Sequence, residues 1–159
     1  MHGILQYNIT VDGEVQLHEA LVGRLGQIED LRPVFRQIAG DIKAGIVRTF
    51  NAEGADEGKP AWQPLSKIYA EWKAKHFPGK PILQRSGKLM AAFTGGAGYI
   101  EEITEDSLEI GGQGVPYAIY HQSHRPRKSN LPRRAFLMLS DAMKERISRY
   151  IVLYINKES

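Results

Sequence analysis

The stretch "LRPVFRQIAGDIKAGIVRTF", residues 31–50, decides the fold because its apolar side chains recur at every fourth position. An α-helix has about 3.6 residues per turn, so side chains at i and i+4 lie on the same face. Pro33 is compatible with the first turn, where its missing N–H would have no helical acceptor. The spacing therefore predicts a helix from about Leu31 with one buried stripe, formed by Val34, Ile38, Ile42, Ile46 and Phe50.

Shorter elements are predicted on both sides of this helix. Apolar and polar residues alternate over 5–11, which is typical of a half-buried strand. Two further strands, flanked by glycines, are joined by the acidic turn Glu105-Asp106. The remaining predicted elements are strands at Tyr99–Thr104 and Ser107–Gly111, a helix over 14–26, a helix over Pro64–Lys75 with Leu65, Ile68, Tyr69 and Trp72 on one face, a helix capped by Ser86 that runs through Leu89, Met90 and Phe93, a short helix or turn at 115–122, and a terminal helix from Ser140 marked by Met143, Ile147, Ile151 and Tyr154.

These elements predict one domain, residues 1–159, of the α+β class. We expect a small antiparallel or mixed sheet with a projecting hairpin, packed against several helices, and a long C-terminal helix. A chain of 159 residues can bury a core without disulfides or a structural metal. The absence of cysteine excludes thiol catalysis and cysteine-ligated zinc. No signal-peptide pattern and no apolar run of roughly 20 residues is present, so we expect a soluble chain without a membrane partner.

Charge is arranged in bands along the chain, although the formal net charge is only +3. Residues 59–88 carry seven cations against the single Glu71, and residues 101–109 carry five carboxylates and no base. The segment 125–134 is basic again. Such bands usually form solvated faces, but in a self-assembling protein they can match opposite signs between neighbouring subunits.

Two polar loops are expected to be mobile until a neighbour orders them. The first is the Gly-rich "NAEGADEGKPAWQ", residues 51–63, and the second is the basic segment 122–133. The glycine-flanked strands have edges that can add to the sheet of a neighbour.

No catalytic, cofactor or metal site is predicted. The Gly87-Lys88 pair lacks the glycine that a P-loop needs at position 82, and Leu89 stands where the hydroxyl is required. His121 and His124 have a spacing that can bind a metal, but the His-Glu-x-x-His pattern is absent. The carboxylates of 101–109 alternate with apolar residues, as on a solvated strand face. We therefore expect a protein that is not an enzyme; a small enzyme using His121 with a carboxylate is the weakest alternative.

The basic loop at 125–134 supports a second functional interpretation. Its cations are Arg125, Arg127, Lys128, Arg133 and Arg134, and such side chains neutralise phosphates well. No helix-turn-helix, zinc module or aromatic ribonucleoprotein signature accompanies them. The loop is thus a solvated surface, a contact to an acidic protein, or a nucleic-acid-binding module. Reversing the charges of Arg133 and Arg134 is expected to leave folding intact.

The structural role of five large apolar residues can be interpreted in two ways. Core packing is the first interpretation and anchoring of an interface is the second, since aromatic side chains dominate both settings. The residues concerned are Trp62, Trp72, Leu83, Tyr117 and Phe136.

Four motifs in a fixed order give the chain a resemblance to a known family. "AWQPLS" follows the Gly-rich loop, and "ILQRSGKL", "PYAIYHQ" and "LPRRAFLMLS" come after it, before the closing helix. From about Phe50 to the C-terminus the chain resembles the phage virion morphogenesis family, which contains tail completion proteins of contractile-tailed and Mu-like phages. One departure is that Ser123, His124 and Arg125 follow the His-Gln pair, where the family often has a glycine. The family pattern maps onto Trp62, Pro64, Leu65, Ser66, Leu83, Gly87, Leu89, Tyr117, Ala118, His121, Gln122, Pro132, Arg134 and Phe136.

This resemblance implies a structural virion protein at the head-proximal end of the tail, made in the host cytoplasm. It implies tail completion and head–tail joining by a ring of copies, commonly sixfold, that contacts tail-tube and head-connector proteins. Packaged DNA would pass through the lumen, lined by either the acidic hairpin or the basic loop. The candidate assembly residues are Trp62, Leu83, Tyr117, His121, Arg125, Arg127, Lys128, Arg133, Arg134 and Phe136.

Overall fold

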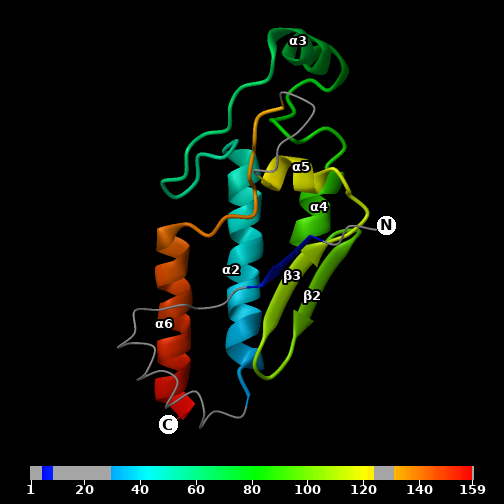
Figure 1. Ribbon diagram of the computed structural model, residues 1–159. Helices are drawn as coiled ribbons and strands as arrows, with labels where there is room; N and C mark the ends of the chain where they lie inside the picture. The colour runs from blue at the N-terminus through cyan, green and yellow to red at the C-terminus, as the bar shows by residue number, and fades with distance from the viewer. Residues whose placement is uncertain (1–4, 9–29, 124–130, 159) are drawn as a thin grey trace.

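Helix α2 (Arg32–Asn51) is the centre of the structure, a computed structural model that describes residues 5–8, 30–123 and 131–158 (Figure 1). The long helix α6 (Asp141–Glu158) runs beside α2 in the opposite direction. On the other side of α2 lie α4 (Lys88–Thr94) and a three-stranded sheet. This arrangement confirms the predicted α+β class with a small sheet, several helices and a long C-terminal helix.

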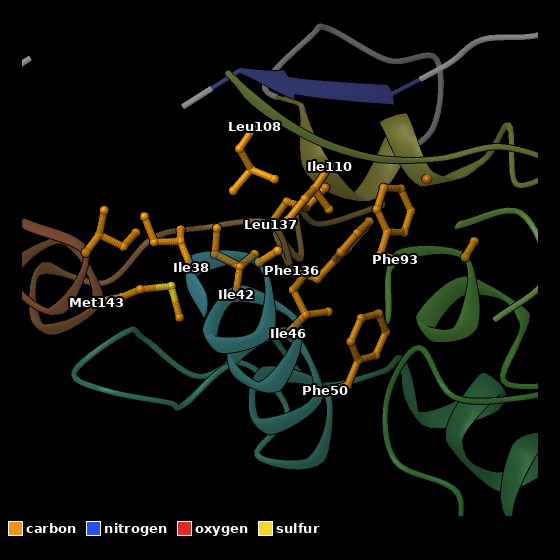
Figure 2. Packing of buried hydrophobic residues seen from close by; sticks show 14 of the residues in the cluster. Ile38, Ile42, Ile46, Phe50, Phe93, Leu108, Ile110, Phe136, Leu137 and Met143 are labelled. Atoms are coloured by element: carbon orange, nitrogen blue, oxygen red, sulfur yellow. The ribbon is translucent and has the colours of Figure 1, made fainter. Parts of the chain in front are cut away.

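The apolar stripe of α2 forms the core, as its spacing predicts. All five predicted positions, from Val34 to Phe50, are at most 4 % exposed. Residues from α4, the sheet and α6 pack around them, as Figure 2 shows. Phe136 lies between Phe93 and Phe50, with ring centroids 5.0 and 5.4 Å away. The core therefore joins elements that are far apart in the sequence.

The sheet has the order β1–β3–β2, with all neighbours antiparallel. Its strands are β1 (Leu5–Asn8), β2 (Tyr99–Ile103) and β3 (Leu108–Gly112), which confirms the predicted hairpin and part of the first predicted strand. Residues 9–11 of that strand and the predicted helix over 14–26 lie outside the described residues.

The hairpin lies along α2 and α4 and projects into solvent only at its turn. Leu108 and Ile110 of β3 point into the core. A side chain at Gly112 would place its Cβ 2.6 Å from the carbonyl oxygen of Ala92, so the glycine permits α4 to pack directly on the strand. The backbone N–H of Leu31 donates to the carbonyl of Glu105 at 2.9 Å, which attaches the turn to the start of α2.

Two helix starts differ from the predictions: α3 (Lys67–His76) begins three residues after the predicted start at Pro64, and α4 has a different N-cap. Ser86 was the predicted cap, but Gly87 occupies the N-cap position with φ of 80°, and the Ser86 hydroxyl is 3.5 Å from the nearest backbone N–H. A left-handed φ strongly favours glycine, so Gly87 sets the entry of α4. The short helix predicted around 115–122 is confirmed as α5 (Ala118–Gln122).

The terminal helix is confirmed, with one more buried residue than predicted. Met143, Ile147 and Ile151 face α2, and Ile155 continues the series at 1 % exposure. Tyr154 is half-buried, and its hydroxyl donates to the carbonyl of Asp30 at 2.8 Å. Within the described ranges, no helix has the length and apolar character needed to cross a membrane.

The Gly-rich loop 51–63 is fixed by its own chain, which corrects the prediction that it needs a neighbour. Arg146 of α6 lies 2.9 Å from the Asp41 carboxylate and 2.7 Å from that of Glu57. Glu57 also accepts from the Ser140 hydroxyl, and these hydrogen bonds hold its pKa below the usual value. Salt bridges and hydrogen bonds from distant segments therefore order this loop.

Candidate assembly interface

The four sequence motifs converge on one cleft of about 810 Å³. It lies between α3 (Lys67–His76), the start of α4, α5 and the segment 131–134. Residues 63–66 come from the first motif, 83–89 from the second, Tyr117 and His121 from the third, and Leu131, Pro132 and Arg134 from the fourth. Segments that are separate in the sequence thus form a single site.

Arg134 connects three of the motifs beneath this cleft. Its side chain is buried, with 4 % of the residue exposed, and its guanidinium donates to the carbonyls of Gln63 and Pro64 at 2.9 and 3.0 Å. Its backbone N–H donates to the carbonyl of His121 at 3.0 Å. Burial lowers the pKa of Arg134, and within the described ranges no carboxylate is among its hydrogen-bond partners. The prediction that Arg134 belongs to a basic surface loop is therefore wrong, because its charge is used to hold backbone carbonyls.

Gln122 holds the third motif against the fourth. Its side-chain oxygen accepts the backbone N–H groups of Phe136 and Leu137, each at 3.1 Å, and its amide nitrogen donates to the Leu137 carbonyl at 2.6 Å. A single side chain thus provides partners for three backbone groups of the fourth motif. Neighbouring Arg133 remains exposed, although its Nε donates to the Gln122 carbonyl at 2.8 Å.

Lys73 shapes the opposite wall of the cleft. It is 5 % exposed, and its ammonium donates to the carbonyls of Lys80 and Pro81, so it ties α3 to the turn that precedes α4. Burial lowers the pKa of Lys73. Two residues after Pro81, Leu83 has a φ of 62°, a left-handed value that non-glycine residues rarely adopt. The second motif therefore reaches the cleft in a conformation that its environment imposes.

The apolar face of α3 is exposed, which corrects the prediction that Trp72 is a core residue. Ile68 is 84 % exposed, and Tyr69 and Trp72 are each 40 % exposed. The indole of Trp72 stacks on Tyr69 and on His76, with ring centroids 5.5 and 4.7 Å apart. The guanidinium of Arg85 lies 6.0 Å from the Trp72 ring. Helix α3, which carries these aromatic side chains, stands at one end of the molecule, away from most of α2 (Figure 1).

Exposed large apolar side chains are concentrated around the cleft. Tyr117, at 42 % exposure, is a second core prediction that is wrong. Of the seven such side chains in the described residues, six line the cleft or lie on α3 and α5, namely Ile68, Tyr69, Trp72, Tyr117, Tyr120 and Leu131. The seventh is Leu153 on α6. A cluster rich in tyrosine and tryptophan is typical of a protein interface.

The cleft is basic as well as apolar. Among the described residues, its lining contains lysine and arginine but neither aspartate nor glutamate. Lys73 and Arg134 are held by carbonyls, whereas Arg85 and Lys88 are exposed. A partner of opposite charge is therefore favoured at this surface.

The remaining predicted site residues lie in the core, in the cleft wall or outside the described residues. The core prediction is confirmed for Phe136 and for Trp62, which are 1 % and 7 % exposed. Both belong to the buried core, and Leu83 is half-buried in the cleft wall. Arg125, Arg127 and Lys128, with His124, lie outside the described residues.

No metal centre is found among the residues that the structure describes, since no group of three or more His, Asp or Glu side chains is gathered there.

One comparison with known proteins gives a match. The model of the phage virion morphogenesis family matches residues 13–156, a range that includes all four motifs and the whole cleft. No curated protein and no solved structure matches the chain.

Proposed function

The chain belongs to the phage virion morphogenesis family, and from this premise we propose that it completes the head-proximal end of the phage tail and joins it to the filled head. Family membership itself makes it a phage assembly protein associated with the virion. The position in the tail or neck, the ring of copies and the absence of catalysis are parts of the proposal. Tail-tube and head-connector proteins are the partners that we propose beside further copies of the chain.

The observation that carries this proposal is the cleft. An assembly protein needs surfaces that are stable alone and become buried on a neighbour. The motifs that carry the family resemblance form this cleft. Aromatic side chains and two cations, Arg85 and Lys88, are exposed at its rim. Tyrosine, tryptophan and arginine are the residues that most often dominate binding energy at interfaces.

The core gives the proposal a second support. Trp62, Phe136, Gln122 and Arg134 serve to hold the cleft walls through buried packing and hydrogen bonds. Such a frame keeps the exposed side chains of the rim in place before docking, which lowers the entropic cost of binding.

Electron microscopy of a lysate tests the proposal. The phage or induced prophage that encodes the chain would carry an early stop codon in this gene, and the same mutant supplied with the wild-type chain from a plasmid would serve as control. We expect free filled heads beside unattached tails in the mutant, and joined particles in the control. Normally tailed particles in the mutant would exclude a role in completion and joining.

A further inference from the structure

The described chain has opposite charge at its two ends. The cleft rim, which we define as Arg85 and Lys88 with the α3 side chains Ile68, Tyr69 and Trp72, lies at the C-terminal end of α2, where α4 starts and beyond which α3 stands in Figure 1. The hairpin turn lies at the N-terminal end of α2, as Figure 1 and the Leu31–Glu105 hydrogen bond both show. The 20 residues of α2 separate the two ends by roughly 30 Å at about 1.5 Å per residue. One chain therefore cannot bring its own two ends together.

The acidic end is formed by Glu102, Glu105, Asp106 and Glu109, which we call the acidic edge. Glu102 and Glu109 are directly opposite each other on β2 and β3, a pairing that is unfavourable for like charges. One carboxylate oxygen of Glu109 is buried and has no hydrogen-bond partner within the described ranges. The side chain of Glu105 is 66 % exposed, and its ion pair with Arg32 is long, at 3.7 Å. Within the described residues, this long pair with Arg32 is the only ion pair that a carboxylate of the acidic edge makes.

Glu101, on the same strand β2 as Glu102, is a carboxylate whose charge is paired within the chain. It points to the inner side of the sheet, where Lys43 of α2 lies 3.0 Å away and the Tyr99 hydroxyl donates to it. The acidic edge, on the outer side and in the turn, has no comparable partner in the described part of the chain.

The basic end has the complementary excess. None of the lysines and arginines of residues 60–123 forms an ion pair with a described carboxylate. Arg85 and Lys88 are exposed beside the aromatic row of α3. At the acidic end, by contrast, the apolar side chain of Ile100 lies on the outer side of β2 next to Glu102.

From these observations we propose that the cleft rim of one copy binds the acidic edge of a second copy, so that copies associate head to tail. The inference rests on the proposed self-association of the assembly protein and identifies the two surfaces that make the contact. Each copy then uses two different surfaces, and such a contact produces a closed ring when the rotation between copies closes. The exposed α3 side chains become buried in the contact, and the exposed charges of both ends become paired.

Charge reversal of each end, followed by sedimentation velocity of the purified chain, tests this contact. The first variant is Arg85→Glu/Lys88→Glu, the second is Glu102→Lys/Glu105→Lys, and the third carries all four changes. Lys144→Glu/Arg149→Glu, which reverses two exposed cations of α6, is the matched control. Thermal melting shows that each variant folds.

We expect the wild-type chain and the control to associate, more weakly as salt is raised, because the screening length falls from about 8 Å at physiological ionic strength to about 3 Å at 1 M. Each two-residue variant should be monomeric alone. An equimolar mixture of the two should associate again beyond a dimer, because the intact rim meets the intact edge and the two reversed surfaces are also opposite in charge. The four-residue variant should associate again.

Several results would overturn the contact. These are a wild-type chain that stays monomeric at low salt, a folded Glu102→Lys/Glu105→Lys variant that associates as the wild type does, and a folded four-residue variant that remains monomeric. A monomeric wild type together with unjoined heads and tails in the stop-codon lysate would remove this contact and leave the joining role in place.

Discussion

Arg134→Glu is expected to prevent stable folding, while Arg133→Glu leaves stability within about 0.5 kcal/mol of the wild type. The Arg134 guanidinium is buried and donates to two backbone carbonyls, so a carboxylate there would face the carbonyl oxygens of Gln63 and Pro64. An uncompensated buried charge costs about 3–5 kcal/mol, a large part of the stability of an ordinary domain. Arg133 is exposed and donates one hydrogen bond to Gln122.

Urea denaturation of the two variants measures this difference. Arg134→Met is a milder companion that keeps much of the side-chain volume and removes the donors, and we expect it to lose about 1–3 kcal/mol. If Arg134→Glu unfolded at the same urea concentration as Arg133→Glu, the guanidinium would have no structural role.

Trp62→Ala is expected to destabilise the chain by about 3–5 kcal/mol, whereas Trp72→Ala costs less than about 1 kcal/mol. Trp62 meets the Phe50 ring edge-on at 5.6 Å, and its indole N–H donates to the Ala135 carbonyl at 2.9 Å. A Cβ at Gly54 would lie 2.6 Å from its ring, so the ordered loop is built around it. Trp72 is 40 % exposed and contacts mainly its own helix and Arg85.

These are the two tryptophans of the chain, so their comparison separates a residue of the core from one of the surface. Equilibrium denaturation followed by circular dichroism measures both variants without relying on the fluorescence that each change alters. Equal losses of stability would contradict the division between a folded frame and an exposed rim.

Periodicity predicted the elements that bury their apolar residues on their own chain. The i, i+4 spacing of α2 and the glycine-flanked strands of the hairpin are local signals, and both elements are present as expected. The same spacing in α3 predicted a helix correctly but gave no information on what covers its apolar face. Ile68 and Trp72 are exposed, because amphipathicity is equally suited to a core and to a partner.

Local sequence patterns could not predict the contacts between segments that are distant in the chain. Arg134 is held by carbonyls about 70 positions earlier in the chain, and the polar loop 51–63 is held by Arg146 and Ser140 of a later segment. The order of the four motifs indicated the segments that matter, and their convergence on one cleft became visible only in three dimensions. Arg85, Lys88, Tyr120, Leu131 and Ile68 were not singled out as site residues. The first four lie within the motifs, and Ile68 lies on the apolar face predicted for the helix over 64–75.

The central claim is that the exposed α3 face beside the cleft serves assembly and contributes little to folding. Its most direct test is the number of infectious particles produced when the stop-codon mutant is supplied with Ile68→Glu/Trp72→Ala, with Leu153→Glu on α6 as the control for an exposed apolar residue made acidic. We predict that both chains melt close to the wild type, that Leu153→Glu restores wild-type titre, and that Ile68→Glu/Trp72→Ala loses at least about tenfold, the effect of about 1.4 kcal/mol in binding. Full titre from a folded Ile68→Glu/Trp72→Ala chain would contradict the account.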